Sequence, residues 1–369
     1  MRVLMVHPRM DMMGGGERVA IHSIIAALTE GHEVVLISEE FDVKKFEDFF
    51  GCDGLFSKIQ RYTYPTFEPF APGFILYQRL RYYQKELRGL LLKDRNFQLV
   101  LSTQDVGFVG SERLAPLVQY CYYPEYFLHL ESHPSSPLWT IYYWPATRFY
   151  RDRIRIVDQF LSVSEFTRNL IKARWGRESK TLYPPCPVGS YTATNTSRED
   201  LVVTVGRFSP EKRMHVFADI ARSLPNFKFV IIGSISGQGE KYYEWLRRNS
   251  PGNVSFVLSP LRKVRDILAR AKVYVHCAKN EHFGITIVEA MAAGCVPIVH
   301  DSGGPREIVT DDVGYRWRAS PEAVGQISGL FEDEELRQRL SKSASTRAHM
   351  FRPEAFESGF RRVLKDYAQ

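Results

Sequence analysis

The sequence is poor in cysteine and has no long apolar run. Its five cysteines lie far apart without a C-x-x-C pair, which argues against a disulfide framework or a zinc site and for a reducing compartment. No apolar run approaches the roughly 18 residues that span a bilayer, and the first residues lack the layout of a signal peptide. We therefore expect a cytoplasmic protein without a spanning segment.

Short-period repeats, heptads and low-complexity tracts are also missing, so the chain is expected to be globular. At 369 residues it exceeds the size at which one core usually divides, and its hydrophobic content of 44% is ample for packed cores. The formal charge of +7 favours anionic partners such as phosphates, lipid head groups or nucleic acid.

Apolar runs alternate with helical patterns in two halves of the same type. We expect strands at 2–7, 33–38, 98–102, 117–123 and 159–164 in the first half, and at 201–206, 228–233, 254–258, 273–277 and 296–300 in the second. Prolines at 184, 185 and 187 cannot continue a helix or a central strand, so they mark a linker.

This alternation predicts an α/β protein of two Rossmann-like, doubly wound domains facing a central cleft. The expected boundaries are residues 1–185 for an N-terminal Rossmann-like domain, 186–200 for the linker and 201–350 for a C-terminal Rossmann-like domain. A C-terminal helix at 351–369 is expected to pack back on the N-terminal domain. Ligands of such folds bind at the carboxyl ends of the strands.

Two glycine- or proline-containing turns follow strands at this edge. Gly14, Gly15 and Gly16 let backbone approach a ligand before a helix that runs to Leu28. They do not form a G-x-G-x-x-G fingerprint, and a merely tight turn is the alternative. In the second half, Pro210 suits the first position of a helix, over whose start Arg207 and Lys212 can meet to bind phosphate.

The most informative segment is the stretch from Glu281 to Glu289, two carboxylates separated by seven residues. A loop entering a helix near Gly284 offers unpaired N–H groups for a phosphate. The two flanking carboxylates can accept hydrogen bonds from sugar hydroxyls. The segment therefore predicts a sugar-nucleotide site.

With Gly206, Arg207 and Lys212, this segment resembles the retaining glycosyltransferases of family 4, which have the GT-B fold. The resemblance implies that Arg207, Lys212 and Glu281 form the catalytic group, with the first two on the donor diphosphate. Further donor-binding positions would be Gly15, Gly16, His282, Phe283, Gly284, Ile285 and, on the ribose, Glu289. It also implies no metal, since such enzymes lack a metal-binding D-x-D, and no cofactor besides the nucleotide-sugar co-substrate.

Three further segments, at 120–124, 138–143 with 162–167, and 300–305, are similar to the GDP-mannose-dependent mannosyltransferases that extend the polyprenol (dolichol)-linked oligosaccharide at the cytosolic membrane face. The resemblance implies a lipid-linked or glycan acceptor and acceptor-side residues Tyr122, Tyr123 and Glu125. Tyr122 departs from the pattern, because those enzymes have histidine there. His129 and His133 lie nearby and are read as surface histidines.

Residues 60–90 and 120–155 mix aromatic rings with Arg and Lys, among them Arg79, Arg81, Trp144 and Arg148. This mixture suits an anionic membrane surface, and an aromatic core with solvated basic faces is the alternative. Nucleic acid is not expected, because no RNA-binding motif accompanies the pattern. We therefore expect a peripheral protein on the cytosolic face of a membrane.

The combined reading is a retaining, metal-independent hexosyltransferase. Mannose from GDP-mannose is the expected donor sugar, and a UDP-sugar with a soluble or other lipid acceptor is the alternative. A sugar-nucleotide hydrolase or epimerase on the same fold and a non-catalytic sugar-binding subunit are the rivals from other classes.

Overall fold

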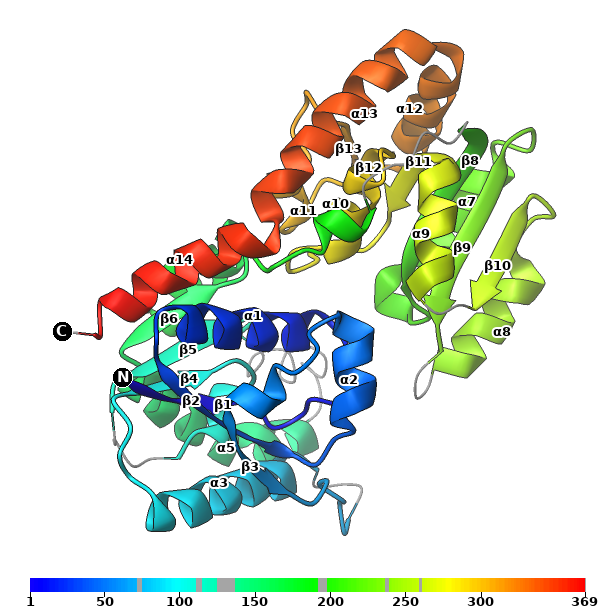
Figure 1. Ribbon diagram of the computed structural model, residues 1–369. Coiled ribbons are helices and arrows are strands. Elements are labelled where there is room, and N and C mark those ends of the chain that lie inside the picture. Colours follow the sequence, from blue (N-terminus) through cyan, green and yellow to red (C-terminus); the bar gives the residue numbers. More distant parts are fainter. Residues whose placement is uncertain are drawn as a thin grey trace. The chain divides into compact units, whose positions relative to one another are not determined.

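The computed structural model describes residues 1–71, 75–110, 115–124, 137–191, 198–235, 239–258 and 261–368, with backbone only for residues 261 and 262. The chain divides into two compact units. The first is Met1–Pro185 together with the segment from Glu354 onward, and the second is Cys186–Pro353. Each unit is built on one parallel sheet (Figure 1).

The first unit holds a seven-stranded sheet in the order β3-β2-β1-β4-β5-β6-β7. All neighbouring strands run parallel. The strands are β1 (Arg2–Val6), β2 (Glu33–Glu39), β3 (Gln60–Tyr64), β4 (Leu99–Ser102), β5 (Leu117–Cys121), β6 (Gln159–Ser162) and β7 (Ser179–Thr181). The order reverses direction beside β1, so the loops after β1 and β4 are the expected place for a ligand.

Helices cover both faces of this sheet. In Figure 1, α1 (Gly15–Thr29) lies on one face, and α3 (Ile75–Lys93) and α5 (Pro137–Ile156) lie on the other. The C-terminal helix α14 (Pro353–Lys365) is held to α1 by His22 Nδ1 and a Glu357 carboxylate oxygen, 2.8 Å apart. In the described part of this unit, the other α-helices are α2 (Val43–Phe50) and α6 (Glu165–Trp175).

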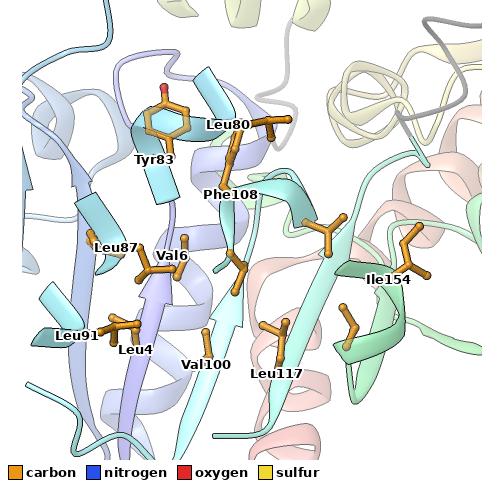
Figure 2. Packing of buried hydrophobic residues seen from close by; sticks show 14 of the residues in the cluster. Leu4, Val6, Leu80, Tyr83, Leu87, Leu91, Val100, Phe108, Leu117 and Ile154 are labelled. Carbon is orange, nitrogen blue, oxygen red and sulfur yellow. The ribbon is translucent and has the colours of Figure 1, made fainter. Parts of the chain in front are cut away.

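The core of the first unit forms where α3 meets the sheet. Leu80, Tyr83, Leu87 and Leu91 recur at helical spacing and point at strand residues such as Leu4, Val6 and Val100 (Figure 2). Because this face of α3 packs in the core, the side chains on the other faces of the helix are available to line the surface or a pocket.

The second unit holds a six-stranded parallel sheet in the order β10-β9-β8-β11-β12-β13. Its strands are β8 (Glu199–Arg207), β9 (Lys228–Ser234), β10 (Val254–Leu258), β11 (Ala271–His276), β12 (Val296–His300) and β13 (Tyr315–Trp317). Its helices are α7 (Met214–Arg222), α8 (Gly239–Asn249), α9 (Leu261–Arg270), α10 (Ile285–Ala292), α11 (Pro305–Ile308), α12 (Ser320–Glu332) and α13 (Glu334–Ala348). The expected α/β class with two parallel-sheet domains is confirmed.

Candidate functional site

The second unit gathers polar side chains in the loop between β11 and α10. Lys212 Nζ, from the loop after β8, lies 2.5 Å from Glu281 Oε2, with the two side chains only 22% and 17% exposed. His276 Nε2, at the end of β11, lies 3.5 Å from the same oxygen. Two residues that the sequence predicted for one site therefore meet across 69 positions of the chain.

Glu281 is held as a carboxylate. Burial alone would raise the pKa of its carboxyl group, but the nearby imidazole of His276 and the charge of Lys212 outweigh burial and bring the pKa below its ordinary value. An ionised, partly buried carboxylate is a strong acceptor for sugar hydroxyls.

The Glu281 loop is fastened to the loop after β12. Gly304 N donates to Glu281 O at 2.9 Å, and Asn280 N donates to Ser302 Oγ at 2.9 Å. A Cβ on Gly304 would come within 2.4 Å of His282 O, so only glycine fits between these loops. This explains the 300–305 segment physically, because its glycines position the backbone that carries Glu281.

The start of α10 is open toward a ligand. Gly284 precedes the helix with φ 107° and has no side chain to cap it, and Ile287 N donates to Gly284 O at 3.0 Å, so the N–H groups of Ile285 and Thr286 are the ones suited to an anion. The ring of Phe283 is buried, and its centre lies 5.3 Å from that of Phe351. Ile285 begins the helix, and Glu289 lies one turn further, 6% exposed. His282 is beside Glu281, and burial lowers the pKa of its imidazole.

The expected helix beginning at Pro210 is wrong. Pro210–Lys212 forms a single 3-10 turn that ends where Arg213 adopts φ 52°, and α7 begins only at Met214. Lys212 is thereby turned toward Glu281, whereas Arg207 is exposed and lines a separate hollow with Pro210 and Tyr242. Arg207 and Lys212 therefore do not meet over a helix start in this structure.

In the first unit, the glycine turn is braced by a buried histidine and a buried glutamate. Gly14 N donates to Glu17 Oε2 at 2.6 Å, and His7 Nε2 lies 3.3 Å from Glu17 Oε1. The other nitrogen of His7 contacts Thr103 Oγ1 at 2.7 Å. Burial would raise the pKa of Glu17, but the contact with His7 outweighs it and lowers the pKa.

The acceptor-side candidates lie beside this turn. Tyr122 Oη donates to Gly16 O at 3.3 Å, which joins two predicted positions 106 residues apart, and burial raises the pKa of its phenol. Tyr123 Oη accepts from Arg174 of α6 at 3.1 Å. Gly15 starts α1 directly behind the turn. Glu125, His129 and His133 lie outside the described residues.

The aromatic and basic stretches divide between core and surface. Tyr83 and Tyr150 are buried, and Arg79 turns inward with its Nε buried, so the surface interpretation is wrong for these three. Exposed side chains form two lines at helical spacing: Arg81, Lys85, Arg88 and Leu92 on α3, and Leu138, Ile141, Trp144 and Arg148 on α5. A groove of about 510 Å³ joins the two helices. Among the described residues, no helix is long and apolar enough to cross a membrane.

Sequence reasoning missed several residues of both sites. His276, His7 and Gln119 are buried polar side chains inside strands that read as apolar runs. A polar residue within such a run was the available signal, because a buried polar group needs a partner.

Comparison with known families assigns both halves of the chain. Residues 13–188 match the family "Glycosyltransferase Family 4", and residues 193–347 match "Glycosyl transferases group 1". The two matches cover the glycine turn in the first unit and the Lys212–Glu281 site in the second.

Curated relatives match parts of the chain. A GDP-Man:Man(3)GlcNAc(2)-PP-Dol alpha-1,2-mannosyltransferase of Yarrowia lipolytica is 33% identical over 39% of this chain and 27% of that protein. Its Homo sapiens counterpart is 29% identical over 60% of this chain and 51% of that protein. The chain thus spans about half or less of the length of these two relatives.

Among solved structures, Anabaena HepE in complex with UDP and glucose is similar over 99% of this chain and 100% of that chain, with a TM-score of 0.74 and 17% identity. This likeness extends to both units and confirms the expected GT-B fold.

Proposed function

Because the chain belongs to the GT-B glycosyltransferases of family 4 and group 1, we propose that it transfers a hexose from a nucleotide sugar to a lipid-linked glycan. The observation that carries the proposal is the Lys212–Glu281 pair beside the open start of α10. A cation, a helix N-terminus and a sugar-binding carboxylate at one place are the groups that a sugar diphosphate requires.

The proposed donor is GDP-mannose, and the proposed acceptor is a dolichol-diphosphate oligosaccharide. Both follow from the names of the relatives, which use GDP-mannose and Man(3)GlcNAc(2)-PP-Dol. A UDP-sugar donor is the second candidate, supported by the bound UDP of the Anabaena enzyme.

In the proposed reaction, donor binding redirects Lys212. Its ammonium leaves Glu281 for the diphosphate, where the N–H groups at the start of α10 and the guanidinium of Arg207 join it. These groups stabilise the charge that develops on the leaving diphosphate, usually a large electrostatic contribution to catalysis. Glu281, released from Lys212 but still beside His276, holds hydroxyls of the transferred sugar, and Glu289 holds the ribose.

The bond changes balance without a protein nucleophile. The bond between the anomeric carbon and the diphosphate oxygen breaks, and the acceptor hydroxyl oxygen bonds to the same carbon. The leaving diphosphate takes the hydroxyl proton on the same face of the sugar, so the anomeric configuration is retained. The charge on the diphosphate is met by Lys212, Arg207 and α10, and we propose that no metal ion is required.

A product assay with GDP-, UDP- and ADP-sugars and a lipid-linked oligosaccharide tests this function. We expect GDP-mannose to support transfer, EDTA to leave the rate unchanged, and Lys212→Ala to weaken nucleoside-diphosphate binding by roughly 10- to 150-fold, the range of one charged hydrogen bond. The matched control is Lys228→Ala. It removes an exposed lysine at the start of β9, whereas the site lies at the carboxyl ends of the strands. Unchanged diphosphate affinity in Lys212→Ala, or consumption of the donor without any acceptor, would contradict the proposal.

A further inference from the structure

The first unit contains a pocket beside its glycine turn that the proposed reaction has not yet used. Its volume is about 270 Å³, near the lower end of the roughly 300–1,000 Å³ typical of small-molecule sites. That space suits one sugar ring or phosphate group. The walls include Arg9 and Asp105 from the loops after β1 and β4, Phe108, Gln119 of β5 and Arg79 of α3.

Gln119 lines this pocket and carries a buried hydrogen-bond acceptor without a partner in the described part of the chain. The residue is only 2% exposed, and its Nε2 donates to Gln104 O at 2.6 Å and to Tyr120 O at 2.9 Å. These two bonds fix the orientation of the amide, while Oε1 has no partner among the described residues. A buried acceptor without a donor is costly, and a sugar hydroxyl supplies the missing donor.

Arg79 presents the complementary group. Its Nε is buried and lacks a hydrogen-bond partner within the described part of the chain, and its guanidinium lies 5.8 Å from the ring centre of Phe67. It leaves α3 on the side opposite to the exposed Arg81. A planar guanidinium that lines a pocket and has an N–H group without a partner is suited to bind a phosphate or a carboxylate.

The charge of the pocket also favours an anion. Arg9 supplies a second guanidinium, and Gln104 anchors its backbone through bonds of 3.1 Å in both directions. Asp105 is the carboxylate of the pocket, and it already accepts from Tyr150 Oη at 2.7 Å and from Gly107 N at 2.6 Å. Arg9 Nε lies 3.8 Å from Asp11 Oδ1 in an exposed ion pair, so Arg79 is the lining cation that is left for an anionic group.

We infer that this pocket binds the sugar-phosphate junction of the acceptor, with Arg79 on a phosphate of the diphosphate and Gln119 on a hydroxyl of the adjoining sugar. The inference rests on the proposed function, since that function supplies a diphosphate-linked acceptor. It makes Arg79 a specificity-determining residue that distinguishes a lipid-diphosphate glycan from the same glycan without phosphate. It also gives α3 two functional sides, because the exposed line of basic residues begins at Arg81 and the side that lines the pocket carries Arg79.

The experiment compares two acceptors with wild type, Arg79→Ala, Arg79→Lys and the matched control Lys44→Ala, which removes an exposed lysine of α2. One acceptor is Man3GlcNAc2 linked to a short-chain prenyl diphosphate, and the other is the same glycan as an octyl glycoside. We expect Arg79→Ala to raise the KM of the diphosphate-linked acceptor by roughly 10- to 150-fold. The octyl glycoside KM, the melting temperature and the affinity for nucleoside diphosphate should stay unchanged.

Arg79→Lys keeps the charge without the planar fork, so we expect an intermediate rise in KM. An equal rise for both acceptors in Arg79→Ala, or no rise for either, would overturn the inference. If wild type uses neither acceptor, the proposed function fails. Titration calorimetry with the prenyl-diphosphate glycan then tests whether the pocket binds the acceptor. Weaker binding to Arg79→Ala than to Lys44→Ala supports the inference, and equal binding to both or no binding refutes it. Inorganic diphosphate in parallel shows whether the phosphate alone is sufficient.

Discussion

At the scale of single residues, the ion pair between Lys212 and Glu281 links donor binding to sugar binding. The same Lys212 ammonium that contacts Glu281 at 2.5 Å is the group proposed for the diphosphate. Binding the diphosphate must therefore break this pair, and part of the binding free energy is spent on releasing Glu281. The pair acts together with His276 to lower the pKa of the Glu281 carboxyl group.

This competition predicts different results for the two glutamates. Glu281→Gln frees Lys212, so we expect nucleoside diphosphate to bind at least as tightly as to wild type while kcat falls. Glu289→Gln weakens one hydrogen bond to the ribose, so nucleoside-diphosphate affinity should fall about tenfold. Titration calorimetry with the nucleoside diphosphate and steady-state kinetics separate the two effects. Loss of diphosphate affinity in Glu281→Gln would contradict the competition.

His276 gives a second prediction at this scale, because it contacts Glu281 and lies behind it at the end of β11. Once Lys212 has moved, His276 is the group that orients the carboxylate. We expect His276→Ala to lower kcat about tenfold with unchanged diphosphate affinity, since its contact of 3.5 Å is long for a hydrogen bond. His276→Gln should recover part of kcat through its amide N–H. A fall in diphosphate affinity equal to the fall in kcat would show a structural role instead.

At the scale of elements, the site depends on two loops packed against each other at the ends of β11 and β12. Gly304 has helical backbone angles, so alanine there is hindered by the close approach to the backbone of His282 and Phe283, 2.4 Å at His282 O, and not by its φ. The backbone carrying Glu281 must therefore shift if a Cβ is added.

We expect Gly304→Ala to destabilise the second unit by about 1–3 kcal/mol, the usual cost of overpacking, and to abolish tight donor binding. Gly325→Ala is the matched control, because nothing lies within 4 Å of its Cβ position in α12. Replacing that helical glycine should stabilise the protein by roughly 0.5–1 kcal/mol. Thermal unfolding with and without nucleoside diphosphate measures both. Normal donor affinity in Gly304→Ala would show that the loop packing does not position Glu281.

The helices and strands that the sequence predicts correctly are those whose burial shows as a run or a regular spacing of apolar residues. Central strands such as β1 and β12 are mostly apolar, and the helix at Gly284 lies between the apolar strands β11 and β12. The edge strand β3 was missed because its sequence, QRYTY, is polar and mostly exposed. The helix expected at Pro210 failed because proline fits a 3-10 turn as well as an α-helix, and only tertiary contacts decide which continues.

For the candidate site, individual residues were predictable from the sequence, but their contact partners were not. Glu281, Lys212 and Gly16 stand out because charged or glycine residues follow apolar strands. Their partners did not, because the contact of Lys212 with Glu281 spans 69 residues and that of Tyr122 with Gly16 spans 106. Such distances are set by strand order in the sheet, which local pattern does not encode.

For the molecule as a whole, a lipid-linked acceptor requires that the protein reach the surface of a membrane. We propose that the outer sides of α3 and α5 dock on anionic membrane. Leu138, Ile141 and Trp144 are 78%, 71% and 73% exposed on α5, and the basic line of α3 borders a groove whose other wall is Pro145 and Phe149 of the same helix. Exposed apolar side chains beside cations are typical of an interfacial membrane contact.

Each basic residue near an anionic surface contributes about 1 kcal/mol, screened beyond a Debye length of roughly 8–10 Å. The triple variant Arg81→Glu, Lys85→Glu, Arg88→Glu should therefore lose binding to anionic liposomes by at least about 100-fold. Lys44→Glu, Lys45→Glu, Lys58→Glu changes the net charge equally on exposed positions around α2 and should still bind. Trp144→Ser should remove the part of binding that survives high salt. Equal liposome flotation of the two triple variants would show that net charge, and not the α3–α5 surface, holds the protein to the membrane.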